Sequence, residues 1–161
     1  MTATTTKDGR KMGLWFEELT PGLTIEHSIR RTVTEADNVI FSTLTMNPQP
    51  LHLDEQFSAQ TEFGTRVVNG LFTLSLVIGL SVTDISLGTT VANLAYEIVE
   101  MPAPVRHGDT IRVVSAILES RESKSRPTQG IVKLEHKGFN QDDVLVSRVV
   151  RSALFLKRPA A

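Results

Sequence analysis

The chain has 161 residues, a formal net charge of −1 and 40% apolar side chains, which suits one domain with an ordinary hydrophobic core. This near-neutral charge gives no reason to expect nucleic acid or a membrane surface as a partner. The sequence has no cysteine, which excludes disulfides, thiolate metal sites and cysteine nucleophiles. No apolar window approaches the ~20 residues that a membrane-spanning helix needs, so we expect a soluble cytoplasmic protein.

Residues 1–13 are rich in threonine and lysine and lack the apolar run of a signal peptide. We therefore predict a flexible N-terminal tail there, followed by one folded domain at residues 14–158. Within residues 23–32, Ile25 and Ile29 alternate with polar side chains. That alternation predicts a half-buried strand.

A helix is predicted next, with Thr34 as its N-cap and Asp37 as a capping-box acid. It ends before residues 45–54, which contain Pro48 and Pro50. Each proline lacks a backbone donor and biases the preceding residue towards extended conformations. We therefore expect a stiff, extended loop near the surface, which is a suitable place for polar groups of a site.

After this loop, Asp54 predicts the N-cap of a short helix that ends near Gln60. Residues 71–82 are apolar on nearly every side, which predicts a helix at the centre of the protein. Strands are predicted at residues 90–101, 110–121, 131–140 and 144–156. A buried helix followed by a meander of long strands predicts an α+β protein with one antiparallel sheet wrapped around a central helix, the hot-dog fold.

Two blocks of the sequence resemble the MaoC-like, R-specific enoyl-CoA hydratases (hydratase 2). Residues 47–52, Asn-Pro-Gln-Pro-Leu-His, are similar to that family's Asp-x-Asn-Pro-Leu-His. Residues 63–70, Phe-Gly-Thr-Arg-Val-Val-Asn-Gly, are similar to its Phe-Gly-x-x-Ile-Ala-His-Gly, at the family's mutual spacing. The resemblance implies a hot-dog homodimer with a continuous sheet. It also implies a hydratase or dehydratase acting on an acyl-CoA, with no cofactor besides the coenzyme A of the substrate.

Hydration of an unsaturated thioester requires a base for water, an acid for the α-carbon and donors for the enolate oxygen. His52 is the candidate acid and base, because an unperturbed imidazole titrates near physiological pH. Gly70 stands at the expected start of the central helix, where backbone N–H groups lack partners. The resemblance places the family's oxyanion-binding amide there. A histidine bonded to backbone and a glycine needed only for a turn are the structural alternatives.

Asn47 departs from the family pattern, because it stands where the family has an aspartate. An amide cannot be a general base, although Asn47 and Gln49 can both orient a water molecule. Three explanations remain open: catalysis is lost, His52 carries both proton transfers, or the substrate has its own carboxylate. A carboxylate beside such a substrate would be repelled by ~4 kcal/mol at intermediate dielectric. Residues 45–52 also resemble the corresponding segment of MaoC-type proteins of branched C5-dicarboxylyl-CoA metabolism. This resemblance suggests mesaconyl-CoA or itaconyl-CoA as substrate.

Four further residues are candidate substrate contacts. Arg66 could pair with a substrate carboxylate, although a surface arginine is the plainer interpretation, and Asn69 stands where the family has a histidine. Lys124 and Arg126 could bind the phosphates of coenzyme A, although a solvated basic turn is the plainer interpretation. Residues 107–109, His-Gly-Asp, indicate an ordinary turn. We predict no metal site, because no cluster of ligands is present.

Two other classes of function stay open. A non-catalytic acyl-CoA-binding or partner subunit would explain the amide at Asn47. A hot-dog thioesterase would need a carboxylate near the thioester carbon, which Asp54 or Glu55 could supply. The sequence has no phosphate-binding glycine loop and no nucleophile elbow, which argues against nucleotide-dependent and serine-hydrolase chemistry.

Overall fold

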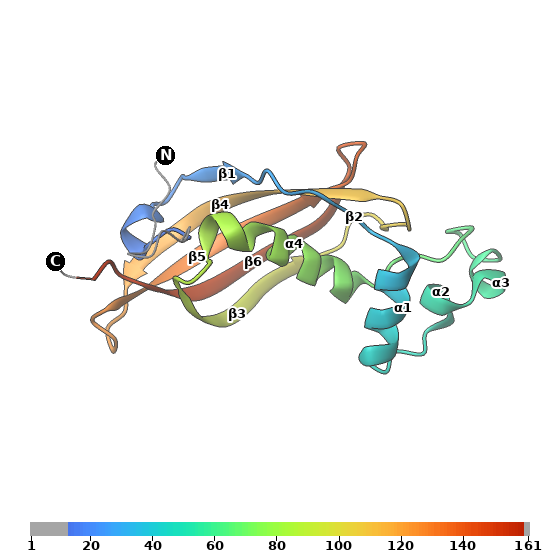
Figure 1. Cartoon of the computed structure of the whole chain (residues 1–161), viewed down its shortest axis with the longest axis horizontal. Coiled ribbons are helices and arrows are strands. Elements are labelled where there is room, and N and C mark those ends of the chain that lie inside the picture. The colour runs from blue at the N-terminus through green and yellow to red at the C-terminus, as the bar shows by residue number, and fades with distance from the viewer. Residues whose placement is uncertain (1–12, 160–161) are drawn as a thin grey trace.

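The computed structural model describes residues 13–159. Its elements in chain order are η1 (Phe16–Glu18), β1 (Thr24–Glu26), β2 (Arg31–Thr32), α1 (Glu35–Leu44), α2 (Pro50–Leu53), α3 (Glu55–Ser58), α4 (Gly70–Ile85), β3 (Thr90–Glu100), β4 (Thr110–Glu122), β5 (Gln129–Phe139) and β6 (Leu145–Leu156). The strands form an antiparallel sheet in the order β1-β4-β5-β6-β3, and β2 also pairs with β4. Helix α4 lies across one face of this sheet (Figure 1). The predicted hot-dog fold, a sheet wrapped around a central helix, is confirmed.

The central helix α4 packs against β4, β5 and β6. Its residues Val77 and Ile85 are completely buried and belong to two separate apolar clusters between the helix and the sheet. Val77 contacts Gly138 of β5, where a side chain would collide with its methyl group, so the missing side chain allows a close approach. The helix is not buried on every side, however, because Leu71 on its first turn is 56% exposed.

Strand β3 forms one edge of the sheet and pairs only through β6 in the part of the chain that the structure describes. Its side chains are mostly exposed, whereas buried and partly exposed positions alternate strictly along β5. The alternation in β5 arises because successive side chains point to opposite faces of a sheet. An edge strand with exposed apolar side chains offers unpaired backbone groups to another chain.

The single strand predicted at residues 23–32 is wrong, because the structure has two short strands, β1 and β2, with a break between them. His27, directly after β1, is buried, and its ring bonds to Asp84 of α4 and Ser115 of β4. Beyond it the chain leaves β4, and Ile29 is 45% exposed rather than half-buried in a strand. The chain meets β4 again only at β2.

Helix α1 begins as predicted. The Thr34 side chain accepts a hydrogen bond from the Asp37 N–H, and the Asp37 carboxylate accepts one from the Thr34 N–H. This reciprocal capping satisfies two of the donors that a helix start leaves without partners. The helix positions Asn38 and Ser42, one turn apart, on its buried face.

The segment after α1 is only partly the extended loop that the two prolines predict. Residues 50–53 form the one-turn helix α2 with Pro50 in its first turn, where the missing N–H of proline costs nothing. His52 therefore lies on a helical turn and not on extended backbone. Asp54 then caps α3 through its bond with the Phe57 N–H, as predicted, although α3 is shorter than expected.

Of the predicted N-terminal tail, only Gly13 belongs to the described residues, and residues 1–12 lie outside them. Gly13 is buried, and its N–H donates to the carbonyl of Leu87 at 2.8 Å. The last residue of the predicted tail is therefore part of the fold. No helix within residues 13–159 has the length and apolarity needed to cross a bilayer.

Candidate active site

A cavity of about 350 Å³ lies where α2, the start of α4 and the segment after β3 meet. His52 and Thr73 are the polar side chains of its lining, and the others are apolar. The lining contains no lysine, arginine, aspartate or glutamate from residues 13–159. Gly70 contributes backbone to the wall. Such an apolar space strengthens the electrostatic effect of the few polar groups that face it.

His52 has a defined tautomer in this cavity. Its Nδ1 lies 2.9 Å from the carbonyl oxygen of Val67. A carbonyl only accepts, so Nδ1 carries a hydrogen, and in the neutral ring the lone pair is therefore at Nε2. The backbone carbonyl of Val67 therefore holds the ring, as expected for a histidine with a structural role. The same bond leaves Nε2 available to a molecule in the cavity.

Gly70 is the first residue of α4 and lines the same cavity. Asn69 caps this helix, since its side-chain oxygen accepts the N–H of Leu71 at 3.0 Å. Within residues 13–159 no acceptor is found for the Gly70 N–H, as expected for the first turn of a helix. A side chain on Gly70 would collide with the sulfur of Met101. The position thus combines a free donor with the positive end of the helix dipole.

Asn47 and Gln49 lie in the loop before α2 but outside the cavity lining. The Asn47 side-chain oxygen accepts the N–H of Gln49 at 3.1 Å, which is a turn that asparagine commonly forms. Asn47 faces a separate hollow beside Ser42 and Leu53. The structure therefore does not bring either amide to the His52 imidazole within this chain.

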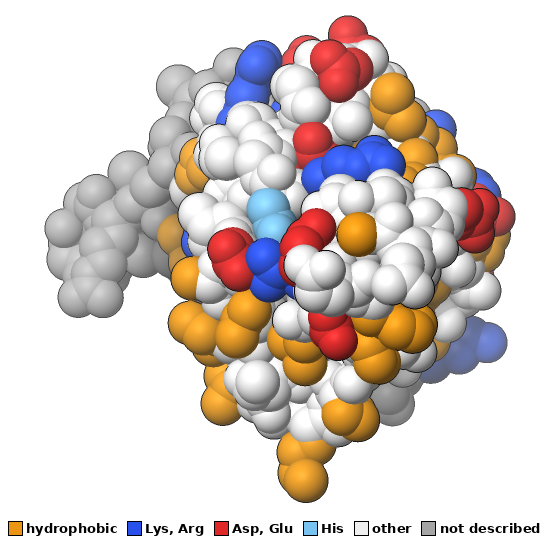
Figure 2. All heavy atoms as spheres, turned by 90° about the vertical axis from the view of Figure 1, so that its right-hand side faces the viewer, with side chains coloured by type: hydrophobic (Ala, Val, Ile, Leu, Met, Phe, Trp, Pro, Cys, Tyr) orange, Lys and Arg blue, Asp and Glu red, His pale blue; other side chains and the backbone are white. Residues whose placement is uncertain are grey.

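Arg66 and Asn69 are also placed away from the interior of the cavity. Arg66 forms ion pairs with Glu35 and Glu55, each at 2.7 Å. Hydrogen bonds to these two carboxylates raise the pKa of Arg66, and the bond from Arg66 is the largest cause of the lowered pKa of Glu55. Figure 2 shows acidic and basic side chains next to one another on this end of the molecule. Asn69 is buried as the cap of α4.

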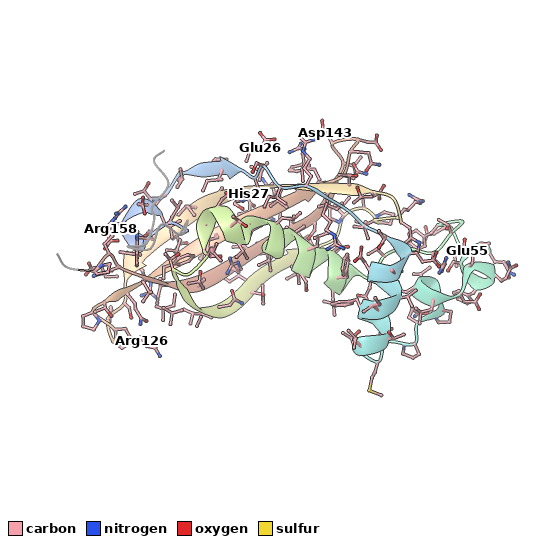
Figure 3. All side chains as sticks on the ribbon, in the orientation of Figure 1. Glu26, His27, Glu55, Arg126, Asp143 and Arg158 are labelled. Atoms are coloured by element: carbon pink, nitrogen blue, oxygen red, sulfur yellow. The ribbon has the colours of Figure 1, made fainter. Side chains whose placement is uncertain are left out.

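Lys124 and Arg126 are in the turn between β4 and β5. This turn lies at the end of the molecule opposite α1 to α3, as the labels of Arg126 and Glu55 show in Figure 3. The two cations are exposed, and Arg126 bonds weakly to Gln129 at 3.4 Å. Within one chain they are far from His52.

Sequence reasoning missed Asn38 and gave His107 no role. Asn38 is fully buried, and its side chain bonds to the His52 carbonyl, the Asn69 N–H and the His107 ring. The turn at residues 107–109 is confirmed, with Gly108 at a φ of +95°. The local pattern did not indicate Asn38, because the apolar Ile40 and Leu44 of α1 are 56% and 79% exposed whereas the buried residues of this helix are the polar Asn38 and Ser42.

The chain matches the family model described as MaoC like domain over residues 17–139. It is 32% identical to a mesaconyl-CoA hydratase of Cereibacter sphaeroides over 149 residues, which are 92% of this chain and 43% of that protein. It is 34% identical to a 3-hydroxybutyryl-CoA dehydratase of Methylorubrum extorquens over 110 residues, covering 66% of this chain and 65% of that one. The solved MaoC-like dehydratase of Rhodospirillum rubrum superposes with a TM-score of 0.82 at 30% identity, covering 92% of this chain and 100% of that one.

This chain belongs to the family of MaoC-like domains. The family expected from the two sequence blocks is thereby confirmed. The chain spans less than half the length of the mesaconyl-CoA hydratase and of a similarly related beta-methylmalyl-CoA dehydratase from Chloroflexus aurantiacus, at 43% and 41% of those proteins.

Proposed function

We propose that this protein is a hydro-lyase that adds water reversibly across the double bond of an enoyl-CoA thioester. One observation carries the proposal: the His52 imidazole and the Gly70 backbone line the same apolar cavity. The former offers a lone pair at Nε2 and the latter a free N–H at a helix start. The names of relatives, which are hydratases and dehydratases of CoA thioesters, support it.

In the proposed reaction, Nε2 of His52 takes a proton from water while the water oxygen bonds to the β-carbon. The π electrons of the double bond then move onto the thioester oxygen, which the Gly70 N–H stabilises. The imidazolium of His52 then gives the proton to the α-carbon. The enolate becomes the neutral thioester again, and the imidazole is again neutral. No carboxylate of the described chain lines the cavity, so in this scheme His52 carries both transfers.

For the acyl group, we propose a branched C5 dicarboxylyl thioester such as mesaconyl-CoA or itaconyl-CoA. The mesaconyl-CoA hydratase of Cereibacter sphaeroides supports this choice. The charge argument for Asn47 applies only to an acyl group that extends to the hollow this amide faces, outside the cavity of His52, where an amide does not repel a substrate carboxylate. Arg66 is not available inside the cavity to bind that carboxylate, since Glu35 and Glu55 hold it outside.

A non-catalytic, acyl-CoA-binding partner subunit is the second candidate. Asn47 favours it, because the amide turns away from His52 and bonds to the Gln49 backbone. A thioesterase is disfavoured, because neither candidate carboxylate reaches the cavity. Asp54 caps α3, and Glu55 pairs with Arg66.

We also propose that two copies of the chain pair through strand β3. Tyr96, Val99 and Met101 on or just after this edge are exposed by 50%, 42% and 42%. Met101 also lines the cavity. A second copy at this edge would therefore extend the sheet and cover the cavity mouth, as the family resemblance implies.

The test is a hydration assay that follows loss of the enoyl-thioester absorbance with crotonyl-CoA, mesaconyl-CoA and itaconyl-CoA. Replacing His52 by alanine should abolish turnover, and His52→Gln is its matched control. Glutamine can still donate to the Val67 carbonyl but cannot shuttle a proton, so it should be inactive as well. Activity retained in His52→Gln would show a purely structural histidine. No turnover by the wild type, with thioester binding intact, would favour the partner subunit.

A further inference from the structure

Asn38 of α1 connects the two segments that carry the candidate catalytic groups. Its Nδ2 donates to the carbonyl of His52 at 3.0 Å and to that of Val67 at 3.3 Å. Its Oδ1 accepts the N–H of Asn69 at 2.9 Å. The Val67 carbonyl is also the group that holds the His52 ring. One buried side chain thus bonds to the backbone of His52 and to the backbone of Asn69, the residue before Gly70.

These partners fix the orientation of the Asn38 amide. Carbonyl oxygens only accept and backbone N–H groups only donate. The NH₂ group must therefore face His52 and Val67, and the oxygen must face Asn69. A flipped amide would place its oxygen against the carbonyls of His52 and Val67 and its NH₂ group against the N–H of Asn69, so none of these contacts would be a hydrogen bond. The amide accordingly has one satisfied arrangement in a site with no exposure to water.

His107 supports the same orientation from the loop between β3 and β4. Its Nε2 lies 3.0 Å from the Asn38 Nδ2, so Nε2 accepts and the imidazole is neutral. The NH₂ group has two hydrogens for three acceptors, so the longest contact, to the Val67 carbonyl at 3.3 Å, shares a hydrogen with one of the other two. Burial, and next the charge of Arg66, lower the pKa of His107. The neutral form is therefore favoured at neutral pH. The histidine that sequence reasoning assigned to an ordinary turn completes the set of partners of the amide.

We propose that Asn38 is a positioning residue that fixes the His52 imidazole relative to the Gly70 N–H. This inference rests on the proposed function, because it names the residue that aligns the two groups of that reaction. His52 and Gly70 come from segments 18 residues apart, on separate helices. Asn38 bonds to the His52 carbonyl and to the N–H of Asn69, the residue before Gly70, and a misplacement of about 1 Å can cost ~100-fold in rate.

The test is Asn38→Asp, which keeps the shape of the side chain and the oxygen that accepts from Asn69. It replaces the donating NH₂ by an oxygen that faces two carbonyls. We expect kcat to fall roughly 100-fold while KM stays within roughly threefold, because the cavity walls are unchanged. A lower melting temperature with unchanged kcat of the folded protein would show a merely structural amide and would overturn the proposal.

Two further variants control this experiment. Ser81→Ala removes another fully buried polar group, whose hydroxyl donates to Ile78 within α4, and should leave kcat unchanged. Where Asn38→Asp does not fold, His107→Gln and His107→Leu test the amide from its other side. Glutamine retains an acceptor and should preserve kcat, whereas leucine should lower it. Equal kcat in both would contradict the proposed role.

The imidazole tautomer gives a readout that does not require turnover. In long-range ¹H–¹⁵N spectra, assigned with the His52→Gln variant and recorded where the ring is neutral, the wild type should show the His52 tautomer with its hydrogen on Nδ1. Asn38→Asp should give a mixture of tautomers as the helical turn that carries His52 loosens. If the wild type hydrates no thioester, the proposed function fails. The comparison of the His52 signals of the wild type and Asn38→Asp then still tests whether Asn38 positions the imidazole. An unchanged His52 signal in Asn38→Asp would then refute it.

Discussion

The sulfur of Met101 occupies the space that a side chain on Gly70 would need. Gly70→Ala should therefore push Met101 aside and place a methyl group beside the N–H that is proposed to bind the thioester oxygen. Met101 is flexible and 42% exposed, so the loss of stability should be small, about 1 kcal/mol. We expect kcat/KM to fall by roughly 10- to 100-fold, measured by steady-state hydration kinetics.

The double variant Gly70→Ala with Met101→Ala separates crowding from loss of the donor. Partial recovery of kcat/KM would indicate that the collision with Met101 causes the defect. No recovery would indicate that the methyl group blocks the approach of the substrate to the amide. Full activity of the single variant would contradict the role proposed for Gly70.

Asn47→Asp tests the charge argument for the acyl group. The carboxylate can still accept from the Gln49 N–H, so the loop should keep its shape. Where the acyl group reaches the hollow that residue 47 faces, this charge should repel a dicarboxylyl substrate and shift the ratio of kcat/KM values towards crotonyl-CoA, by roughly tenfold or more. Competition assays with crotonyl-CoA and mesaconyl-CoA measure this ratio. An unchanged ratio would remove the support that Asn47 gives to a dicarboxylyl substrate.

Arg66→Ala tests whether this arginine contacts substrate. Both of its partners, Glu35 and Glu55, have substantially exposed side chains, so the ion pairs should contribute little to the free energy of unfolding. We expect KM for every thioester to remain within roughly twofold. A large rise in KM confined to dicarboxylyl thioesters would show instead that Arg66 leaves its ion pairs to bind the substrate.

Acid should destabilise the protein through His136. Arg151 donates to the ring Nε2 at 3.0 Å, and the ring Nδ1 lies 2.6 Å from the Ser115 hydroxyl. Burial first, then Arg151 and His27, hold the pKa of His136 well below its ordinary value of 6.5. The unfolded chain therefore binds more protons than the folded one at acidic pH. The stabilisation is complete above pH 6.5 and is lost as the pH falls from there towards the lowered pKa.

Urea titrations between pH 8 and 5 measure this effect. The free energy of unfolding should decrease below neutral pH with a slope approaching about 1.4 kcal/mol per pH unit for each such proton. His136→Gln should reduce the slope, because glutamine can accept from Arg151 and does not titrate. His107, whose pKa is also lowered, contributes with the same sign. A slope unaffected by His136→Gln would assign the acid sensitivity to other groups.

Val99→Lys tests the proposed pairing of two chains through β3. A lysine at this edge should separate the copies, because burying its charge in a strand interface is unfavourable. Light scattering during gel filtration should show loss of the dimer. Val144→Lys is the matched control, since Val144 is 43% exposed, close to the 42% of Val99, and precedes β6 outside the β3 edge. A dimer that survives Val99→Lys would place the interface elsewhere.

The first helix, the central helix, the four long strands and the two signature segments could be predicted from the sequence, whereas the pair β1 and β2 could not. Thr34 predicted the start of α1, and the apolar run after Gly70 predicted the central helix, because capping and periodicity are local properties. The prolines at positions 48 and 50 predicted a break after α1. They did not predict α2, because Pro50 is compatible with both an extended loop and a first helical turn.

Which polar groups face one another was decided only by the tertiary structure. The family resemblance of the two signature segments selected His52 and Gly70, and the fold places both on one cavity. The fold also joins Asn38 to His107, 69 residues apart, a pairing that depends on how α1 meets the loop after β3. Sequence determines which side chains can donate, accept or titrate. Only packing determines their partners, since the hydrogen bonds of a buried group require distances that no local pattern specifies.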